Sequence, residues 1–257
     1  MVNDRRGRGE IGDDELAPFK GYSEDTLIKM LYSSVAAKRT IASKLLSECG
    51  TERSVKALCD RLWVEKKLYT RIAVCESLVT LQDSAYPYLL EMLSTIGNNQ
   101  QKEIPQKGFL KTSYPLPRDL AARTLCRFDK QYLGRFIDFA YQLQSLLALE
   151  QLIDVIGHMV YSHRVKMDSR KIIGLYSIHQ TEMVKYKVIR SLSGLHDLGA
   201  KEFLYKNLND PNRGIQFETV RSLILSGIGL EKDAEQLLVP EVRDFAAKLL
   251  IKCRYRL

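Results

Sequence analysis

The amino-acid sequence predicts an all-α protein, an α-solenoid of about seven stacked helical hairpins. Residues 70–83, TRIAVCESLVTLQD, place Thr70, Val74 and Leu78 on one face of a helix and Glu76 on the opposite side. A basic residue followed at helical spacing by small or apolar residues then recurs along the chain. This signature occurs at Arg39, Arg71, Arg118, Lys185 and Arg243, and in weakened form at Gln216. A chain of 257 residues is long for one compact core, whereas stacked hairpins extend to any length.

Seven helical pairs follow from this periodicity and from the capping residues between them. Their approximate boundaries are 23–34 and 37–48, 51–63 and 68–81, 85–96 and 118–128, 131–141 and 145–161, 167–178 and 182–195, 200–208 and 214–226, and 232–238 and 240–253. Ser23 and Thr51 are suitable N-caps, and Gly50 is a stop signal between them. The sequence 210–212, Asp-Pro-Asn, predicts a turn because proline cannot continue the preceding helix. Pro240 suits the first turn of the last helix.

Two segments fall outside the hairpin pattern. Residues 1–21 mix Gly, Arg, Asp and Glu without apolar periodicity, which predicts a disordered N-terminal tail before a solenoid over residues 22–257. Residues 97–116, GNNQQKEIPQKGFLKTSYPL, predict an inserted loop that is long for a helix-to-helix connection. Such a loop is either padding, whose deletion leaves stability nearly unchanged, or a functional arm. The candidate contact residues of an arm are Lys107, Phe109, Lys111 and Tyr114.

Composition indicates a folded protein with a basic surface. The chain has 45% hydrophobic and 27% charged residues, too many apolar residues for a disordered protein, and a formal net charge of +8. A basic protein of this kind favours an acidic protein surface or a polyanion as partner, although the charge can also serve solubility alone. The five cysteines stand singly in helical patterns without metal-binding spacing, which predicts reduced core residues. We find no membrane-spanning run and no signal-peptide pattern, so a cytoplasmic location is expected.

Three segments resemble the HEAT repeat, in particular the short HEAT-like variety named after phycobilisome lyases. They are TRIAVCESLVTLQD, LNDPNRGIQFETVRSL and VPEVRDFAAKLL, against a consensus of approximately D-P-x-x-x-V-R-x-x-A-A-x-A-L. The resemblance implies an ARM-type superhelix in which the second helix of each pair lines a concave groove. The match departs from the consensus at Gln216, where arginine is missing, and in the fourth pair, where the motif is absent.

The position five residues after each signature residue is basic in five of six repeats. Because it lies nearly opposite the apolar stripe, it is expected to face solvent, and by the resemblance that face is the concave groove. The alternative stays open that lysine and arginine occur at this position by chance, because any position exposed to solvent accepts them. Lys187 adds a further cation in the fifth pair. The predicted partner-binding residues are Lys44, Arg123, Lys187, Arg190, Arg221 and Lys248.

The leading functional hypothesis is a non-enzymatic scaffold that binds a protein or acidic peptide along this groove. Nucleic-acid binding through phosphate contacts by the same cations, in a role related to DNA repair, is the alternative. Motifs for nucleotide phosphate loops, nucleophile elbows and metalloprotease sites are absent, so we expect no cofactor and no metal ion. Bilin lyase and DNA glycosylase activities occur in proteins of similar repeats. Neither is favoured, because no lyase segment is shared and aromatic residues are few on the helices expected to line the groove.

Overall fold

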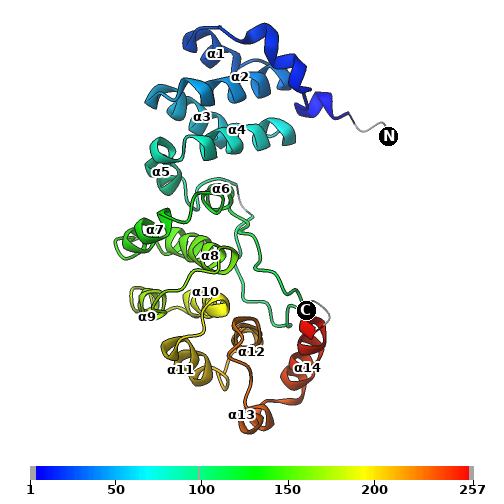
Figure 1. The fold of residues 1–257 in the computed structure, drawn as a ribbon, viewed down its shortest axis with the longest axis vertical. Coiled ribbons are helices and arrows are strands. Elements are labelled where there is room, and N and C mark those ends of the chain that lie inside the picture. The colour runs from blue at the N-terminus through cyan, green and yellow to red at the C-terminus, as the bar shows by residue number, and fades with distance from the viewer. Residues whose placement is uncertain (1–3, 98, 255–257) are drawn as a thin grey trace. The chain divides into compact units, whose positions relative to one another are not determined.

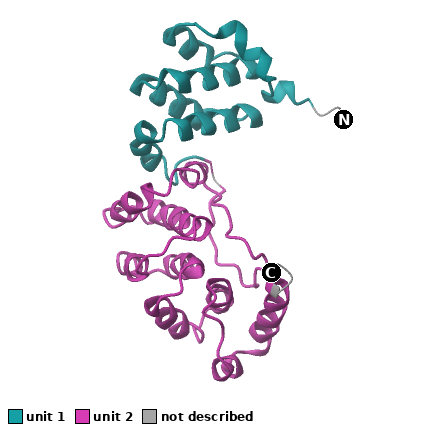
Figure 2. Ribbon diagram, viewed as in Figure 1, with its two compact units in different colours: residues 1–96 teal, residues 97–257 magenta. Residues whose placement is uncertain are grey.

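The computed structural model describes residues 4–97 and 99–254, with the backbone alone of residue 254. The described residues contain helices and connecting segments and no β-strand, which confirms the predicted all-α class. The chain divides into two compact units, residues 1–96 and residues 97–257 (Figure 2). We describe each unit separately.

In its described residues, the first unit contains five α-helices and two short 3₁₀-helices. These are η1 Arg6–Arg8, η2 Asp13–Phe19, α1 Glu24–Met30, α2 Ala36–Cys49, α3 Glu52–Val64, α4 Leu68–Thr80 and α5 Gln82–Glu91 (Figure 1). The even-numbered helices α2 and α4 pack side by side, and α3 packs against α1 and α5 in a second layer. Each predicted pair in this unit is therefore a helical hairpin, α1 with α2 and α3 with α4.

The second unit repeats this two-layer arrangement. Its helices are α6 Leu120–Leu125, α7 Tyr132–Ala140, α8 Leu146–Ser162, α9 Arg170–Ile173 continued by η3 Gly174–Ser177, α10 Glu182–Ser191 continued by η4 Leu192–Gly194, α11 Leu198–Lys206, α12 Arg213–Ser226, α13 Lys232–Leu237 and α14 Pro240–Arg254. The even-numbered helices α6, α8, α10, α12 and α14 contact one another in that order. The helices α7, α9 and α11 cover them from one side by packing on α8, α10 and α12.

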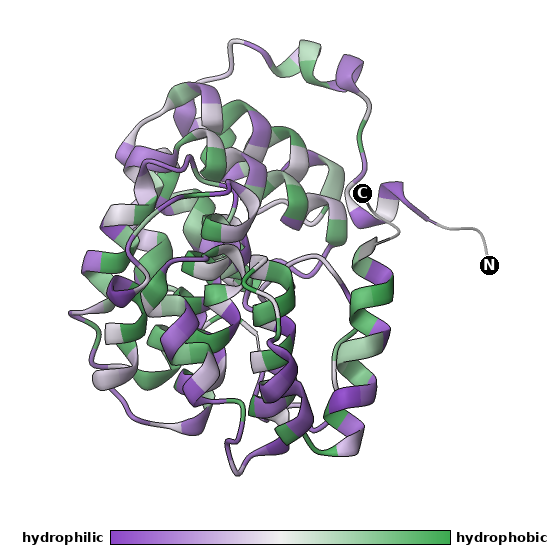
Figure 3. Ribbon diagram, turned by 60° about the horizontal axis from the view of Figure 1, so that its bottom comes forward, coloured by the Kyte–Doolittle hydropathy of each residue, from purple (hydrophilic) through white to green (hydrophobic). Residues whose placement is uncertain are grey.

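The predicted capping residues begin and end these helices. The side chain of Ser23 accepts a hydrogen bond from the Thr26 N–H, and Thr51 accepts one from the Ser54 N–H at 3.0 Å. Gly50 follows α2 with φ of +66°, a left-handed conformation that favours glycine. Polar and apolar residues are interleaved along the helices, as expected when one face of each helix is buried (Figure 3).

The recurring basic residue closes the turn before an even-numbered helix. In four repeats its side chain donates a hydrogen bond to the backbone carbonyl six residues earlier. The pairs are Arg39 with Ser33 (2.8 Å), Arg71 with Glu65 (2.6 Å), Arg123 with Pro117 (3.1 Å) and Gln216 with Asp210 (2.7 Å). The amide of Gln216 thus makes the contact that arginine makes elsewhere. Arg123 rather than Arg118 holds the signature position of the third pair, so the predicted register there is wrong by five residues.

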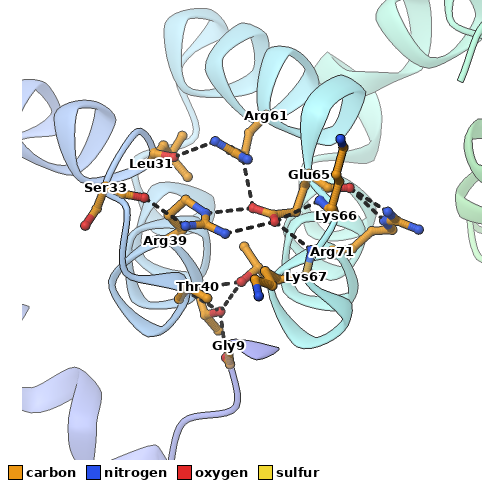
Figure 4. A network of polar contacts seen from close by, with 12 residues as sticks. Gly9, Leu31, Ser33, Arg39, Thr40, Arg61, Glu65, Lys66, Lys67 and Arg71 are labelled. Atoms are coloured by element: carbon orange, nitrogen blue, oxygen red, sulfur yellow. Dashed lines mark hydrogen bonds and ion pairs between the residues drawn. The ribbon is translucent and has the colours of Figure 1, made fainter. Parts of the chain in front are cut away.

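A buried ion-pair network joins the hairpins of the first unit (Figure 4). Arg39 donates two hydrogen bonds to the Glu65 carboxylate, at 2.8 and 3.0 Å, and Arg61 Nε lies 2.9 Å from the same group. The backbone N–H groups of Lys66 and Lys67 also donate to it, at 2.9 and 2.8 Å. Burial opposes ionisation of Glu65, but the hydrogen bonds from Arg39 and Lys67 outweigh it and lower its pKa. The turn between α3 and α4 is thereby fastened to α2.

The N-terminal segment does not behave as the predicted disordered tail. Residues 4–21 include η1 and η2, which contact α2, while residues 1–3 lie outside the described residues. The carbonyl oxygen of Gly9 accepts a hydrogen bond from Thr40 at 2.7 Å. Gly9 has φ of +95°, and a Cβ there would lie 2.3 Å from the Thr70 hydroxyl oxygen. Only glycine fits this close approach, so packing against α2 and α4 orders a segment without apolar periodicity.

Candidate binding surface on the second unit

Three of the residues predicted to line an exposed basic row are buried. Lys187 and Arg221 are 0% exposed, and Arg190 is 7% exposed. The prediction of a solvated face is wrong for these three residues. The reason is tertiary, because the face of α10 and α12 opposite the apolar stripe lies against carboxylates of neighbouring helices and under the segment that precedes α6.

The other three predicted row residues keep varying degrees of exposure. Lys44 belongs to the first unit, is half-buried and lies 4.0 Å from an Asp13 carboxylate oxygen. Arg123 is exposed but holds the turn carbonyl of Pro117, as described above. Lys248 on α14 is exposed. The six cations therefore do not form one continuous row.

The buried cations form an ion-pair cluster across α8, α10 and α12. Lys187 Nζ donates to an Asp154 carboxylate oxygen at 2.8 Å and to the Glu150 carbonyl at 3.0 Å. Arg221 donates to the Glu218 carboxylate at 2.7 Å, and Arg190 Nε lies 3.5 Å from the same oxygen. Three adjacent helices are thus linked through side chains on their buried face.

The local charges set the ionisation of this cluster. Burial would raise the pKa of Glu218, but the Arg190 and Arg221 guanidinium groups lower it. Burial would likewise lower the pKa of Arg190, but the Glu218 carboxylate raises it above its ordinary value. Burial raises the pKa of Glu150, only partly opposed by the charge of Lys187. Arg190 and Glu218 are therefore both charged at neutral pH.

The inserted segment, residues 99–117, crosses this cluster and is called the strap below. In Figure 1 it runs from beside α6 towards α14 and returns. A Cβ on Gly108 would lie 2.2 Å from the Phe245 ring of α14, so the strap packs directly on that helix. Tyr114 is 6% exposed and contacts α8, where a Cβ on Gly157 would lie 2.0 Å from its hydroxyl oxygen. The interpretation of the insertion as padding is therefore contradicted by its packing.

Side chains of the even-numbered helices hold the strap by its backbone. Arg221 donates to the carbonyl oxygens of Lys111 and Ser113, at 3.2 and 2.8 Å, and the Tyr161 hydroxyl donates to that of Thr112 at 2.5 Å. The backbone bends at Thr112 and Ser113, between and at the two carbonyls that Arg221 binds. The strap is thus held by its backbone carbonyls at this bend.

The returning part of the strap alternates between exposed and covered side chains. Lys107, Phe109 and Lys111 are exposed, whereas Tyr114 is buried, so three of the four predicted loop residues are accessible. Phe109 lies between two cations, with Lys111 Nζ at 5.6 Å and the Arg221 guanidinium carbon at 5.7 Å from the ring centre. In the described part of the chain, no backbone N–H of residues 107–113 donates a hydrogen bond. The backbone N–H groups of this segment are therefore open to a partner.

Two hollows adjoin the strap. The smaller, about 480 Å³, lies beside strap residues 110–113 and is also lined by Lys252 of α14. The larger, about 690 Å³, lies between the strap and the helices α8 and α10. Gln151, Asp154, Tyr186 and Arg190 contribute its helical side.

Among the described residues, several buried polar atoms of side chains on the helical side of the larger pocket have no hydrogen-bond partner. These are Nε2 of Gln151, Oδ1 of Asp154 and Nε of Arg190. Gln151 is 1% exposed, and the nearest cation to Asp154 Oδ1 is Arg190 Nη1 at 3.8 Å, beyond hydrogen-bond distance. Unsatisfied buried polar groups are costly and require an explanation.

Sequence reasoning missed Glu150, Gln151, Asp154 and Glu218. The available signal was the predicted helix at 145–161, which the structure places at Leu146–Ser162. Glu150, Gln151 and Asp154 interrupt the apolar residues of its first half. Acidic groups on a buried helix require cationic partners, and Lys187 and Arg190 are those partners.

Within the described residues, no helix is both long enough and apolar enough to cross a membrane. The same residues contain no group of three His, Cys, Asp or Glu side chains arranged to hold a metal ion.

Comparisons with known proteins give little further information. No protein-family model matches the chain, and no curated protein matches it. Among solved structures, the chain is similar to the crystal structure of an engineered protein from the Northeast Structural Genomics Consortium, with 13% identity and a TM-score of 0.34. That alignment covers 80% of this chain and 97% of the engineered protein.

Proposed function

We propose that this protein is a HEAT-like α-solenoid that serves as a non-enzymatic interaction scaffold and binds an acidic protein segment in extended conformation along the strap. The proposal of a HEAT-like solenoid is supported by the successive contacts of the even-numbered helices within each unit and by the repeated hydrogen bond to the preceding turn. Repeats of this kind present long surfaces to other macromolecules. A cytoplasmic location is part of the proposal and agrees with cysteines that form no disulfide bond in the described part of the chain.

The observation that carries the proposed binding mode is the open backbone of the strap. In the described part of the chain, its N–H groups from 107 to 113 donate no hydrogen bond, while its carbonyls at 111–113 are held by Arg221 and Tyr161. A partner peptide can add to such an open backbone as a new strand, with its main chain supplying the hydrogen bonds. Preorganisation of the strap lowers the conformational cost of binding.

The charges around the strap favour an acidic partner. Lys107 and Lys111 are exposed on the strap, and Lys252 lines the adjoining hollow. Lys248 lies one helical turn before Lys252 on α14, so both project from the same side of that helix. The exposed Phe109 adds an apolar contact between these cations.

The nucleic-acid alternative lacks comparable support. Lys187, Arg190 and Arg221 are buried in ion pairs and cannot contact phosphates as they stand. Several accessible cations are needed for strong, salt-dependent phosphate binding. A second test below nevertheless separates the two classes of partner.

Fluorescence anisotropy with a labelled peptide of alternating Glu and Val tests the proposal. We expect saturable binding to the full chain at low salt. The double variant Lys107→Glu and Lys111→Glu should weaken binding on the order of tenfold, because it reverses the charge beside the docking edge. The matched control, Lys29→Glu and Lys56→Glu, alters two exposed lysines of the first unit and should bind as the wild type does.

Equal weakening in both double variants would show that net charge alone drives association and would refute the role of the strap. The same holds if the peptide does not bind at all. Tighter binding of single-stranded RNA or DNA than of the peptide, with affinity falling steeply between low and moderate salt, would favour the nucleic-acid alternative.

A further inference from the structure

The larger pocket has the size of a site for a small molecule. Its volume of about 690 Å³ lies within the range typical of metabolite sites. The strap covers one side and α8 and α10 form the other, so the site lies within the second unit. Lys107 and Phe109, which are proposed above to contact the acidic peptide, also line this pocket, so the two proposed sites share part of the strap.

The helical side of this pocket offers a donor beside an acceptor. Gln151 Nε2 is a buried donor and Asp154 Oδ1 a buried acceptor, and neither has a hydrogen-bond partner. They stand three residues apart on α8, and side chains at this spacing are neighbours on one helical face. A ligand that presents an acceptor next to an N–H donor would satisfy both groups. Amide-like edges of nucleobases have this pattern, which glutamine side chains recognise in other complexes.

The rest of the pocket supplies an apolar wall and positive charge. Tyr186 and three strap prolines, Pro105, Pro115 and Pro117, line it, and their rings give an apolar surface that can pack against a nucleobase. Lys102 and Arg118 line it as well, and both are exposed at its edge without an ion pair in the described part of the chain. These two cations can bind an anionic group that remains near solvent.

We propose that this pocket binds a nucleotide, with the base edge on Gln151 and Asp154 and the phosphate at Lys102 and Arg118. The buried polar atoms and the two edge cations recognise different parts of the same molecule. Base selectivity then comes from α8, and the charge requirement comes from the strap.

Isothermal titration of the full chain with AMP, GMP, CMP and UMP, each at millimolar concentration, tests this proposal. At least one of the four should bind, and its uncharged nucleoside should bind more weakly. Gln151→Leu should abolish the base-dependent binding and also raise the melting temperature, because it removes an unsatisfied buried amide. The control Gln142→Leu makes the same change at an exposed position and should bind as the wild type does.

The double variant Lys102→Gln and Arg118→Gln should lower affinity about tenfold or more and leave the melting temperature unchanged, since both side chains are exposed. Failure of all four nucleotides to bind the wild type would overturn the proposal. So would unchanged binding in Gln151→Leu, or equal affinity for nucleotide and nucleoside. N-acetylglutamine, which carries an amide and a carboxylate without a ring, is included as a probe, and binding as tight as that of the nucleotides would refute the nucleotide assignment. None of these outcomes depends on the peptide assay.

Discussion

Two glycine-to-alanine substitutions should have different effects on the stability of this protein. Gly134 lies on α7 with no atom within 4 Å of a built Cβ, whereas a Cβ on Gly157 of α8 would lie 2.0 Å from the Tyr114 hydroxyl oxygen and 2.5 Å from the Ser191 hydroxyl oxygen. In an open helical position, alanine stabilises by about 0.5 to 1 kcal/mol relative to glycine. We therefore expect Gly134→Ala to raise the free energy of unfolding by about that amount.

Gly157→Ala gains the same helical preference but must displace the strap. Tyr114 is 6% exposed and packs between Gly157 and Tyr161, so its ring has little room to move. Overpacking of this kind costs about 1 to 3 kcal/mol, which outweighs the helical gain or cancels it. The two variants should accordingly differ by about 1 to 3 kcal/mol.

Urea unfolding followed by circular dichroism measures both values on the full chain. Wild-type protein is unfolded in parallel, and equal slopes against urea show that the variants expose the same surface. Equal stabilisation by both substitutions would refute the packing of Tyr114 on α8, and with it the placement of the strap.

Three further outcomes follow from the buried groups of the first unit. Leu78→Ala should lower the free energy of unfolding by about 2 to 5 kcal/mol, because Leu78 is 0% exposed, and a melting curve like that of the wild type would contradict this core assignment. Glu65 has a lowered pKa, so its ion pairs contribute stability above its unfolded pKa of about 4.3, and this contribution is lost as pH falls through the folded value. Glu65→Gln should therefore be less stable than wild type at pH 7 and less sensitive to acid, and parallel pH profiles of the two proteins would rule this out. Burial raises the pKa of Cys59 to about 12, so iodoacetamide at pH 8 should modify the exposed Cys49 well before Cys59; mass spectrometry showing equal rates would indicate that α3 opens readily.

Local sequence was sufficient to locate most helices and their ends. Apolar periodicity and the caps at Ser23, Thr51 and Asn212 act over one or two turns, and the structure places α1, α3 and α12 accordingly. The class of fold followed from the same information. The third pair was less well predicted, because Leu120–Leu125 forms a shorter helix than the pattern over 118–128 suggested.

The character of the candidate site depends instead on contacts between distant parts of the chain. Helical periodicity shows which face of α10 is apolar. It does not show that Lys187, on the opposite face, is neutralised by Asp154, which lies 33 residues earlier in the chain. It also cannot report that Arg221 holds the carbonyl of Lys111, 110 residues earlier. Burial of a charge requires a partner of opposite sign and a cover that excludes water, and both come here from other segments. For that reason residues whose pattern is typical of an exposed basic groove are buried in the folded chain, where they form ion pairs beneath the strap.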